Sequence, residues 1–285
     1  MNSHRRHMLK KRGQAFLFAL IVLVMITILF YPILVMISVS LKESTDVFTT
    51  PVTLIPKKIA WENYADVFRK MDVLTGFKNS AIVTGGSIIV TMLIAIPAAY
   101  ALSKLKFHLK GILYYLILVS QMFAPIIVII PLYQLLNAWG WIDTYQGLIA
   151  MNVTFSLAFI ILMLKSSFDN VPQETLEAAQ IDGCSRFMAL VRVVVPISST
   201  GIAVAVIFTF TRAWNEFLFA FTFNESSQMK TIIVKLYEIV KNNPAIGIQW
   251  HYVMAGAVMT TIPLVVLFIC IRNYITGDAT KGAIK

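Results

Sequence analysis

The chain has 285 residues, of which 58% are hydrophobic and 13% are charged, and its mean hydropathy is +0.76. Soluble domains carry roughly 25% charged residues, so this composition excludes a soluble globular domain and indicates a membrane protein. The formal net charge is +10. Basic residues that anchor and orient membrane spans account for most of this charge, so no nucleic-acid partner is needed to explain it.

Six apolar segments are long enough to cross a membrane. A hydrocarbon core about 30 Å thick requires roughly 20 apolar residues in a helix. The sequence therefore predicts an all-α polytopic membrane protein with six transmembrane helices. The predicted spans, in chain order, are Ala15–Ser38, Ser80–Leu102, Ile112–Leu135, Tyr145–Leu164, Ile197–Phe221 and Tyr252–Ile271.

The distribution of basic residues predicts that both termini are cytoplasmic, because short cytoplasmic loops are enriched in Lys and Arg. The loop after the second span carries Lys104, Lys106 and Lys110, whereas residues 136–144 contain neither Lys nor Arg. The amino-terminal tail is also basic, through Arg5, Arg6, Lys10, Lys11 and Arg12. The long segment 41–79 is rich in lysine too, but long loops weigh less in this rule.

These spans divide the chain into a cytoplasmic tail (1–14), a transmembrane domain (15–271) and a cytoplasmic carboxyl-terminal tail (272–285). The transmembrane domain includes a polar cytoplasmic loop over 165–196. The first apolar block is too long for a signal-peptide core and lacks a small-residue cleavage site, so we expect a retained span. Apolar residues at helical spacing predict short helices in residues 61–71 and 234–240.

Several classes of catalytic site are absent from the sequence. No Gly-Lys dipeptide occurs, so the chain lacks the phosphate-binding loop that many ATPases use. The histidines and the two cysteines show no convincing metal-ligand spacing, and the cysteines do not suggest a disulfide. We therefore predict that the chain is not an enzyme and holds no cofactor or metal.

The most informative segment is the polar loop PQETLEAAQIDGCSRFMALVRVVVP, residues 172–196. Pro172 suits the first turn of a helix, and Gly183 is a natural stop because glycine enters the left-handed conformation without penalty. Leu176, Ala179 and Gly183 recur at helical spacing. A second helix is predicted over Cys184–Val195. Such a short helix suits insertion into a groove of a partner, and the alternative is a solvated connector.

This loop resembles the EAA loop of binding-protein-dependent ABC importer permeases. Glu177, Ala178 and Ala179 match the three letters of that motif, and Gly183 follows after three residues. Nine residues later, Val193, Val195 and Pro196 match an apolar-x-apolar-Pro ending, with Val in place of the usual Ile and Leu. Segments 79–107, 131–149 and 214–221 also look like the second permease subunit of carbohydrate-type, maltose-like systems. The tail 277–285 is similar but departs at Asp278 and Lys281.

The resemblance implies a type I importer fold in a bacterial or archaeal cytoplasmic membrane, with residues 172–183 as a coupling helix. It also implies a function, the import of a sugar or oligosaccharide. The implied partners are a second permease subunit, a cytoplasmic ATPase dimer that binds ATP and Mg²⁺, and an extracytoplasmic solute-binding protein. The residues expected to couple to the ATPase are Glu177, Ala178, Ala179, Asp182, Gly183 and Pro196.

Polar residues inside predicted spans are the other candidates, because intramembrane polar groups are costly. Arg212 and Glu216 are four residues apart, which favours an ion pair on one helix face. Alternatively, Asn215 and Glu216 face a translocation pathway. Gln121 and Asn152 are further pathway candidates, although each also suits a hydrogen bond between packed helices. A proton-coupled secondary transporter is the alternative function, with Glu216 as its coupling carboxylate.

Overall fold

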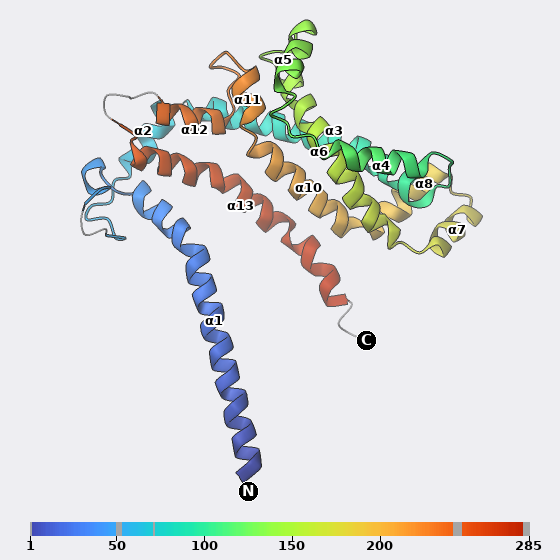
Figure 1. Cartoon of the computed structure of the whole chain (residues 1–285), viewed down its shortest axis with the longest axis horizontal. Helices are drawn as coiled ribbons and strands as arrows, with labels where there is room; N and C mark the ends of the chain where they lie inside the picture. Colours follow the sequence, from blue (N-terminus) through green and yellow to red (C-terminus); the bar gives the residue numbers. More distant parts are fainter. Residues whose placement is uncertain (1, 50–52, 71, 242–246, 282–285) are drawn as a thin grey trace. The chain divides into compact units, whose positions relative to one another are not determined.

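The computed structural model describes residues 2–49, 53–70, 72–241 and 247–281, and every regular element in these ranges is a helix (Figure 1). The predicted all-α architecture is confirmed. The chain divides into two compact units, which comprise Met1–Met71 with Ile239–Met259 and Asp72–Glu238 with Thr260–Lys285.

The first unit is built on a long amino-terminal helix whose end is joined to a short one. The side-chain amide of Asn63 donates to the carbonyl oxygens of Ser40 (2.9 Å) and Lys42 (2.8 Å), and is buried. This amide satisfies carbonyl groups that the end of the long helix leaves without partners. The helix predicted within residues 61–71 is confirmed. The elements are α1 (Asn2–Ser40), the 3₁₀ turn η1 (Ser44–Asp46) and α2 (Glu62–Lys70).

The second unit contains most of the remaining helices, and two helices have residues in both units. The two that continue across the division are α12 (Ile232–Lys241) and α13 (Trp250–Lys281). The others are α3 (Val73–Lys104), α4 (Lys110–Ser120), α5 (Ile129–Ala138), α6 (Tyr145–Asp169), α7 (Gln173–Ile181), α8 (Arg186–Ala189), the π-helical segment η2 (Leu190–Val194), α9 (Val195–Ile197), α10 (Ser199–Trp214) and α11 (Leu218–Phe223).

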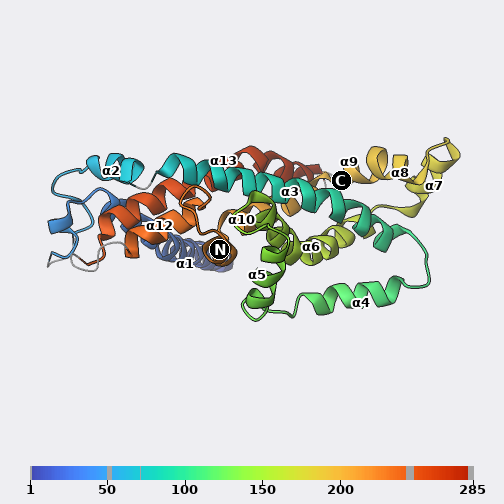
Figure 2. The same ribbon diagram turned by 90° about the horizontal axis from the view of Figure 1, so that it is seen from above.

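The core of the second unit lies between α3, α6 and α10, which pack along one another (Figure 2). Small residues let α3 approach its neighbours closely: Ala95 and Ala99 are fully buried, as is Ala205 on α10. Larger side chains such as Ile160 and Leu164 fill the space around them. Close packing of small residues is the usual way in which helices associate within a membrane, where no hydrophobic driving force acts between them.

Four of the predicted spans are continuous helices. The helices long and apolar enough to cross a membrane are Leu17–Ser40, Val73–Lys104, Tyr145–Asp169 and Trp250–Arg272, and a bent pair, Arg186–Ile197 with Ser199–Trp214, would make a fifth. The predicted tail 1–14 continues α1 from Asn2, and α13 runs into the predicted tail as far as Lys281. Met1 and residues 282–285 lie outside the described residues.

The prediction of one continuous helix over Ile112–Leu135 is wrong. Helix α4 ends at Ser120 and α5 begins at Ile129. Pro125 lies in the interruption; it has no N–H to donate, and it disfavours the helical conformation of Ala124 before it. Hydropathy counts apolar residues and does not register such a break, so the segment forms two short apolar helices.

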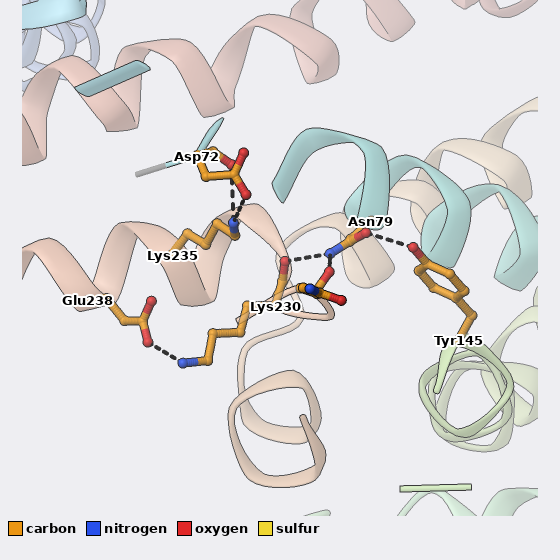
Figure 3. Close-up of polar contacts among 7 residues, drawn as sticks. Asp72, Asn79, Tyr145, Lys230, Lys235 and Glu238 are labelled. Carbon is orange, nitrogen blue, oxygen red and sulfur yellow. Dashed lines mark hydrogen bonds and ion pairs between the residues drawn. The ribbon is translucent and has the colours of Figure 1, made fainter. Parts of the chain in front are cut away.

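Buried polar side chains hold the 224–238 segment against α3 and α6. Asn79, only 1% exposed, donates from its amide to the carbonyl oxygens of Gln228 (2.7 Å) and Lys230 (3.0 Å). Its own amide oxygen accepts a hydrogen bond from the hydroxyl of Tyr145 at 2.8 Å (Figure 3). One side chain on α3 therefore joins two other parts of the second unit.

An ion pair adds to this attachment. The ammonium of Lys235 on α12 lies 2.9 Å from Oδ2 of Asp72 and also donates to the Asp72 carbonyl oxygen at 3.2 Å (Figure 3). Lys235 is buried whereas the Asp72 carboxylate is largely exposed. Hydrogen bonding to Lys235 lowers the pKa of the Asp72 carboxyl below its ordinary value of 3.8. Glu238 pairs with Lys230 on the same segment.

We predict that Asn79→Ala destabilises the chain by about 1–3 kcal/mol, because it leaves buried carbonyl oxygens without a donor. Tyr145→Phe removes only one hydrogen bond and is expected to cost less, about 1 kcal/mol. Unfolding in detergent micelles, with hydrogen exchange of the 224–238 amides, measures both effects. Equal stability of Asn79→Ala and wild type would show that these hydrogen bonds do not hold the segment.

A second prediction concerns pH. Because the native pKa of Asp72 is lowered, its ionised form stabilises the folded state at pH values above 3.8, and this contribution disappears as the pH falls through the lower native value. We expect Asp72→Asn to unfold at a lower temperature than wild type at pH 7 and at the same temperature near pH 2. Asp182→Asn, at an exposed carboxylate, is the matched control. A difference that persists unchanged at low pH would contradict the prediction.

Candidate functional site

The polar loop of residues 172–196 forms a helix, a tight turn and a second, irregular helical segment, at the end of the second unit where α6 ends (Figure 2). Pro172 is the residue before the first turn of α7 rather than a member of it, with φ −59° and ψ 139°. Its fixed φ and extended ψ turn the chain sharply after α6. Glu174 lies in the first turn of α7, where a carboxylate is favoured by the helix dipole.

Gly183 terminates α7 in the left-handed conformation that the sequence predicts for it. Its φ is +86°, in the left-handed region. Beyond it, the Cys184 N–H donates to the carbonyl oxygen of Ala179 at 2.9 Å, while the Gly183 N–H donates to that of Gln180 at 3.0 Å. These two hydrogen bonds form a Schellman motif, which satisfies carbonyl groups at the helix end and fixes the direction in which the chain leaves.

The second helical segment begins at Arg186 and bends before it meets α10. Ser185 caps it, since its hydroxyl accepts the Met188 N–H at 3.2 Å. Pro196 cannot donate to the carbonyl group four residues earlier, and the preceding turn widens into the π-helical segment η2. At Ser198 the direction changes by 83°, so the helix predicted over Cys184–Val195 is present but starts two residues later and is bent away from the fifth predicted span.

One face of this loop is packed into the core of the second unit. Leu176 is 1% exposed and Ala179 is 9% exposed. Leu176 belongs to a buried cluster with residues from the end of α6 and just after it, from α8 and from η2, namely Phe168, Val171, Ala189, Leu190 and Val194. Burial of a leucine side chain stabilises by roughly 1.5–3 kcal/mol, so the loop is firmly attached to the membrane helices. Of the two alanines in the motif, only Ala178 is exposed.

Two large apolar side chains of this loop are exposed, and the sequence analysis did not single them out. Ile181, at the end of α7, is 86% exposed, and Phe187 on α8 is 73% exposed. Glu177, Asp182 and Gly183 lie exposed on the same loop. A sequence signal for Ile181 exists: it follows Leu176 by five residues and is therefore out of phase with the buried face. Exposed apolar side chains on a polar loop with a buried attachment make this loop a candidate contact surface for another protein.

A break in the helix after Trp214 separates Arg212 from Asn215 and Glu216 in the fifth predicted span. Helix α10 ends at Trp214, and Asn215 follows it, donating to the Thr211 carbonyl oxygen at 2.8 Å. Both carboxylate oxygens of Glu216 accept backbone N–H groups of α11, from Phe219 at 2.7 Å and Ala220 at 2.9 Å. Glu216 thus satisfies amides that the first turn of α11 leaves unpaired.

The predicted ion pair between Arg212 and Glu216 is not formed in the described part of the chain. The i,i+4 spacing requires one continuous helix, and the end of α10 at Trp214 removes that condition. Arg212 instead lines a cavity of about 600 Å³ together with Gln121. Asn152 is 4% exposed and donates to the Leu148 carbonyl oxygen of its own helix at 3.0 Å. Of the four predicted pathway residues, Gln121 alone lines this cavity.

Two known permease proteins are similar to this chain in sequence. The chain is 32% identical over 257 residues to the inner membrane ABC transporter permease protein YcjP of Escherichia coli K12, covering 90% of this chain and 91% of that protein. It is 32% identical over 267 residues to the trehalose/maltose transport system permease protein MalG of Thermococcus litoralis, covering 92% and 94%.

The fold is that of a solved transporter. A chain in the crystal structure of a bacterial ABC transporter involved in the import of the acidic polysaccharide alginate matches with a TM-score of 0.79 and 21% identity, over 93% of this chain and 97% of that one. The family model described as the inner membrane component of binding-protein-dependent transport systems matches residues 73–278. This chain therefore belongs to the family of binding-protein-dependent transport system inner membrane components.

Proposed function

We propose that this chain is a transmembrane permease subunit of an ATP-driven importer, and that it carries a sugar or oligosaccharide delivered by an extracytoplasmic binding protein. Family membership supports the permease role, and relatives such as the trehalose/maltose permease support the substrate class. The chain would lie in a bacterial or archaeal cytoplasmic membrane with both termini and the 172–196 loop in the cytoplasm. The basic residues around the first two spans support that orientation.

The observation that carries the coupling role is the exposure of Ile181 and Phe187 on a loop that is anchored by the buried Leu176. In this proposal the pair inserts into a groove of a cytoplasmic ATPase subunit, in the manner of a helix-in-groove contact. Glu177 and Asp182 would contact the rim of that groove, and Ala178 would allow close approach. Gly183 would set the turn that presents both apolar side chains together.

The mechanism follows from the attachment of α7 to the core. ATP and Mg²⁺ would bind to the ATPase dimer, and hydrolysis would take place there rather than on this chain. Closure of the dimer would move α7, and Leu176 would transmit that displacement to α6 and to the segment that ends at Pro196. Reorientation of the spans, together with those of a second permease subunit, would open the substrate pathway inward. The contribution of this chain is therefore mechanical.

The proton-coupled alternative receives no support from the site. It required Glu216 as a carboxylate that exchanges protons with a transport pathway. In the structure both oxygens of Glu216 accept backbone hydrogen bonds from the start of α11, and Glu216 does not line the cavity that contains Arg212. Its role there is to cap a helix.

We predict that Ile181→Glu reduces recovery of the co-expressed ATPase subunit by at least about tenfold when the tagged chain is purified, because a charge would be buried in an apolar contact. The side chain of Ile181 is almost fully exposed, so the folding of this chain should be unaffected. Gln173→Glu is the matched control, since it introduces the same charge at an exposed position in the first turn of α7, where the helix dipole favours it.

The control should retain the ATPase at the wild-type level. Equal recovery with Ile181→Glu and wild type, or failure of wild type to retain any ATPase, would contradict the docking role of this loop. A thermal unfolding measurement on each purified variant separates loss of docking from loss of folding.

A further inference from the structure

The cavity beside Arg212 lies where three parts of the second unit meet. Its volume of about 600 Å³ falls within the range of small-molecule sites, roughly 300–1,000 Å³. The break between α4 and α5 contributes Gln121 and Phe123, the middle of α6 contributes Thr154 and Phe155, and the last turn of α10 contributes Arg212. The interruption of the third predicted span thus forms one wall of the cavity.

Arg212 is a charged residue within the fifth predicted span. It is exposed and lies in the last turn of a membrane-embedded helix, where the helix dipole favours a cation. In the described part of the chain no carboxylate lies within ion-pair distance of its guanidinium, and Glu216, the nearest acidic residue in sequence, is held by the amides of α11. An intramembrane arginine is costly, and such residues usually have a partner or face a ligand pathway.

The other walls suit a saccharide. Phe123 is largely exposed and offers an aromatic face to the apolar C–H groups of a sugar ring, while Phe155 is fixed in place by stacking on Phe219. Gln121 offers both a donor and an acceptor for hydroxyl groups. Thr154 donates its hydroxyl proton to the Ala150 carbonyl oxygen at 2.8 Å, so its oxygen remains able to accept a hydrogen bond.

We propose that this cavity binds an acidic saccharide, with Arg212 forming a bidentate pair with a carboxylate of the sugar. The planar guanidinium matches a carboxylate in geometry as well as in charge, which a lysine or an amide does not. This inference rests on the proposed sugar-import function and narrows its substrate class. A carboxylate on the substrate would give Arg212 the ion-pair contact that it makes with no carboxylate in the described residues.

The test is binding to the full chain in lipid nanodiscs, measured by equilibrium dialysis with two probes of the same ring skeleton. The acidic probe is α-1,4-digalacturonate, and the neutral probe is α-1,4-galactobiose. We expect the acidic probe to bind at least about tenfold more tightly at low salt. That preference should be lost in Arg212→Gln, be partly retained in Arg212→Lys, and decline as salt is added. Arg192→Gln, at an exposed arginine outside the cavity, should keep it.

Equal binding of the two probes, an unchanged preference in Arg212→Gln, or binding of neither probe would overturn the proposal. Loss of the second permease subunit from Arg212→Gln during co-purification would also overturn it, because Arg212 would then be a subunit contact. If galactobiose binds as well as digalacturonate while the ATPase still co-purifies with wild type, the acidic-substrate inference fails and the importer function stands. Loss of ATPase docking itself would instead contradict the proposed function.

Discussion

The burial of Leu176 in a cluster with the end of α6, with α8 and with η2 is the contact that a coupling role of this loop requires. Without it, α7 would be a helix of nine residues on a flexible connection, and helices of that length are not stable alone in water. With it, the exposed side chains of Ile181 and Phe187 are held on a rigid support. The Schellman turn at Gly183 adds a fixed angle between the two helical segments, because its hydrogen bonds leave the chain only one direction in which to continue. In the proposed mechanism, this attachment would transmit a displacement of the loop to the membrane helices.

Two interruptions of helices position functional side chains elsewhere in the second unit. The break at Pro125 opens the wall of a cavity, and the break after Trp214 frees Glu216 to cap α11 while Arg212 faces that cavity. Within a membrane, an irregular backbone is tolerated only where protein or a water-filled cavity supplies partners for its N–H and C=O groups. These breaks therefore indicate sites at which the membrane helices line a cavity or cap another helix. Elsewhere the unit relies on buried polar joints such as Asn79, which ties the 224–238 segment to α3.

Much of this could be predicted from the sequence, and the parts that could not have physical reasons. The EAA loop, its Gly183 turn and the all-α architecture depend on local chemistry and composition, which a sequence displays directly. The prediction of a continuous helix over Ile112–Leu135 is wrong, because hydropathy records apolar character and not the backbone hydrogen bond that Pro125 cannot make. The predicted Arg212–Glu216 ion pair does not form, because α10 ends between the two residues and the amides of α11 bind the carboxylate. The inward position of Ala179 and the exposure of Ile181 depend on how the loop packs against α6, and a motif does not contain that tertiary information.

The most direct test of the central claim uses Cys184, which follows the turn at Gly183 and is partly exposed. In a Cys270→Ser background, this thiol is the only one in the chain. The measurement is the rate at which a membrane-impermeant maleimide labels it in inside-out vesicles, with and without the ATPase subunit. The account predicts labelling in inside-out but not in right-side-out vesicles, and strong protection when the ATPase is present. Equal labelling rates with and without the ATPase, or labelling only from the outside, would contradict the placement of this loop at a cytoplasmic ATPase contact.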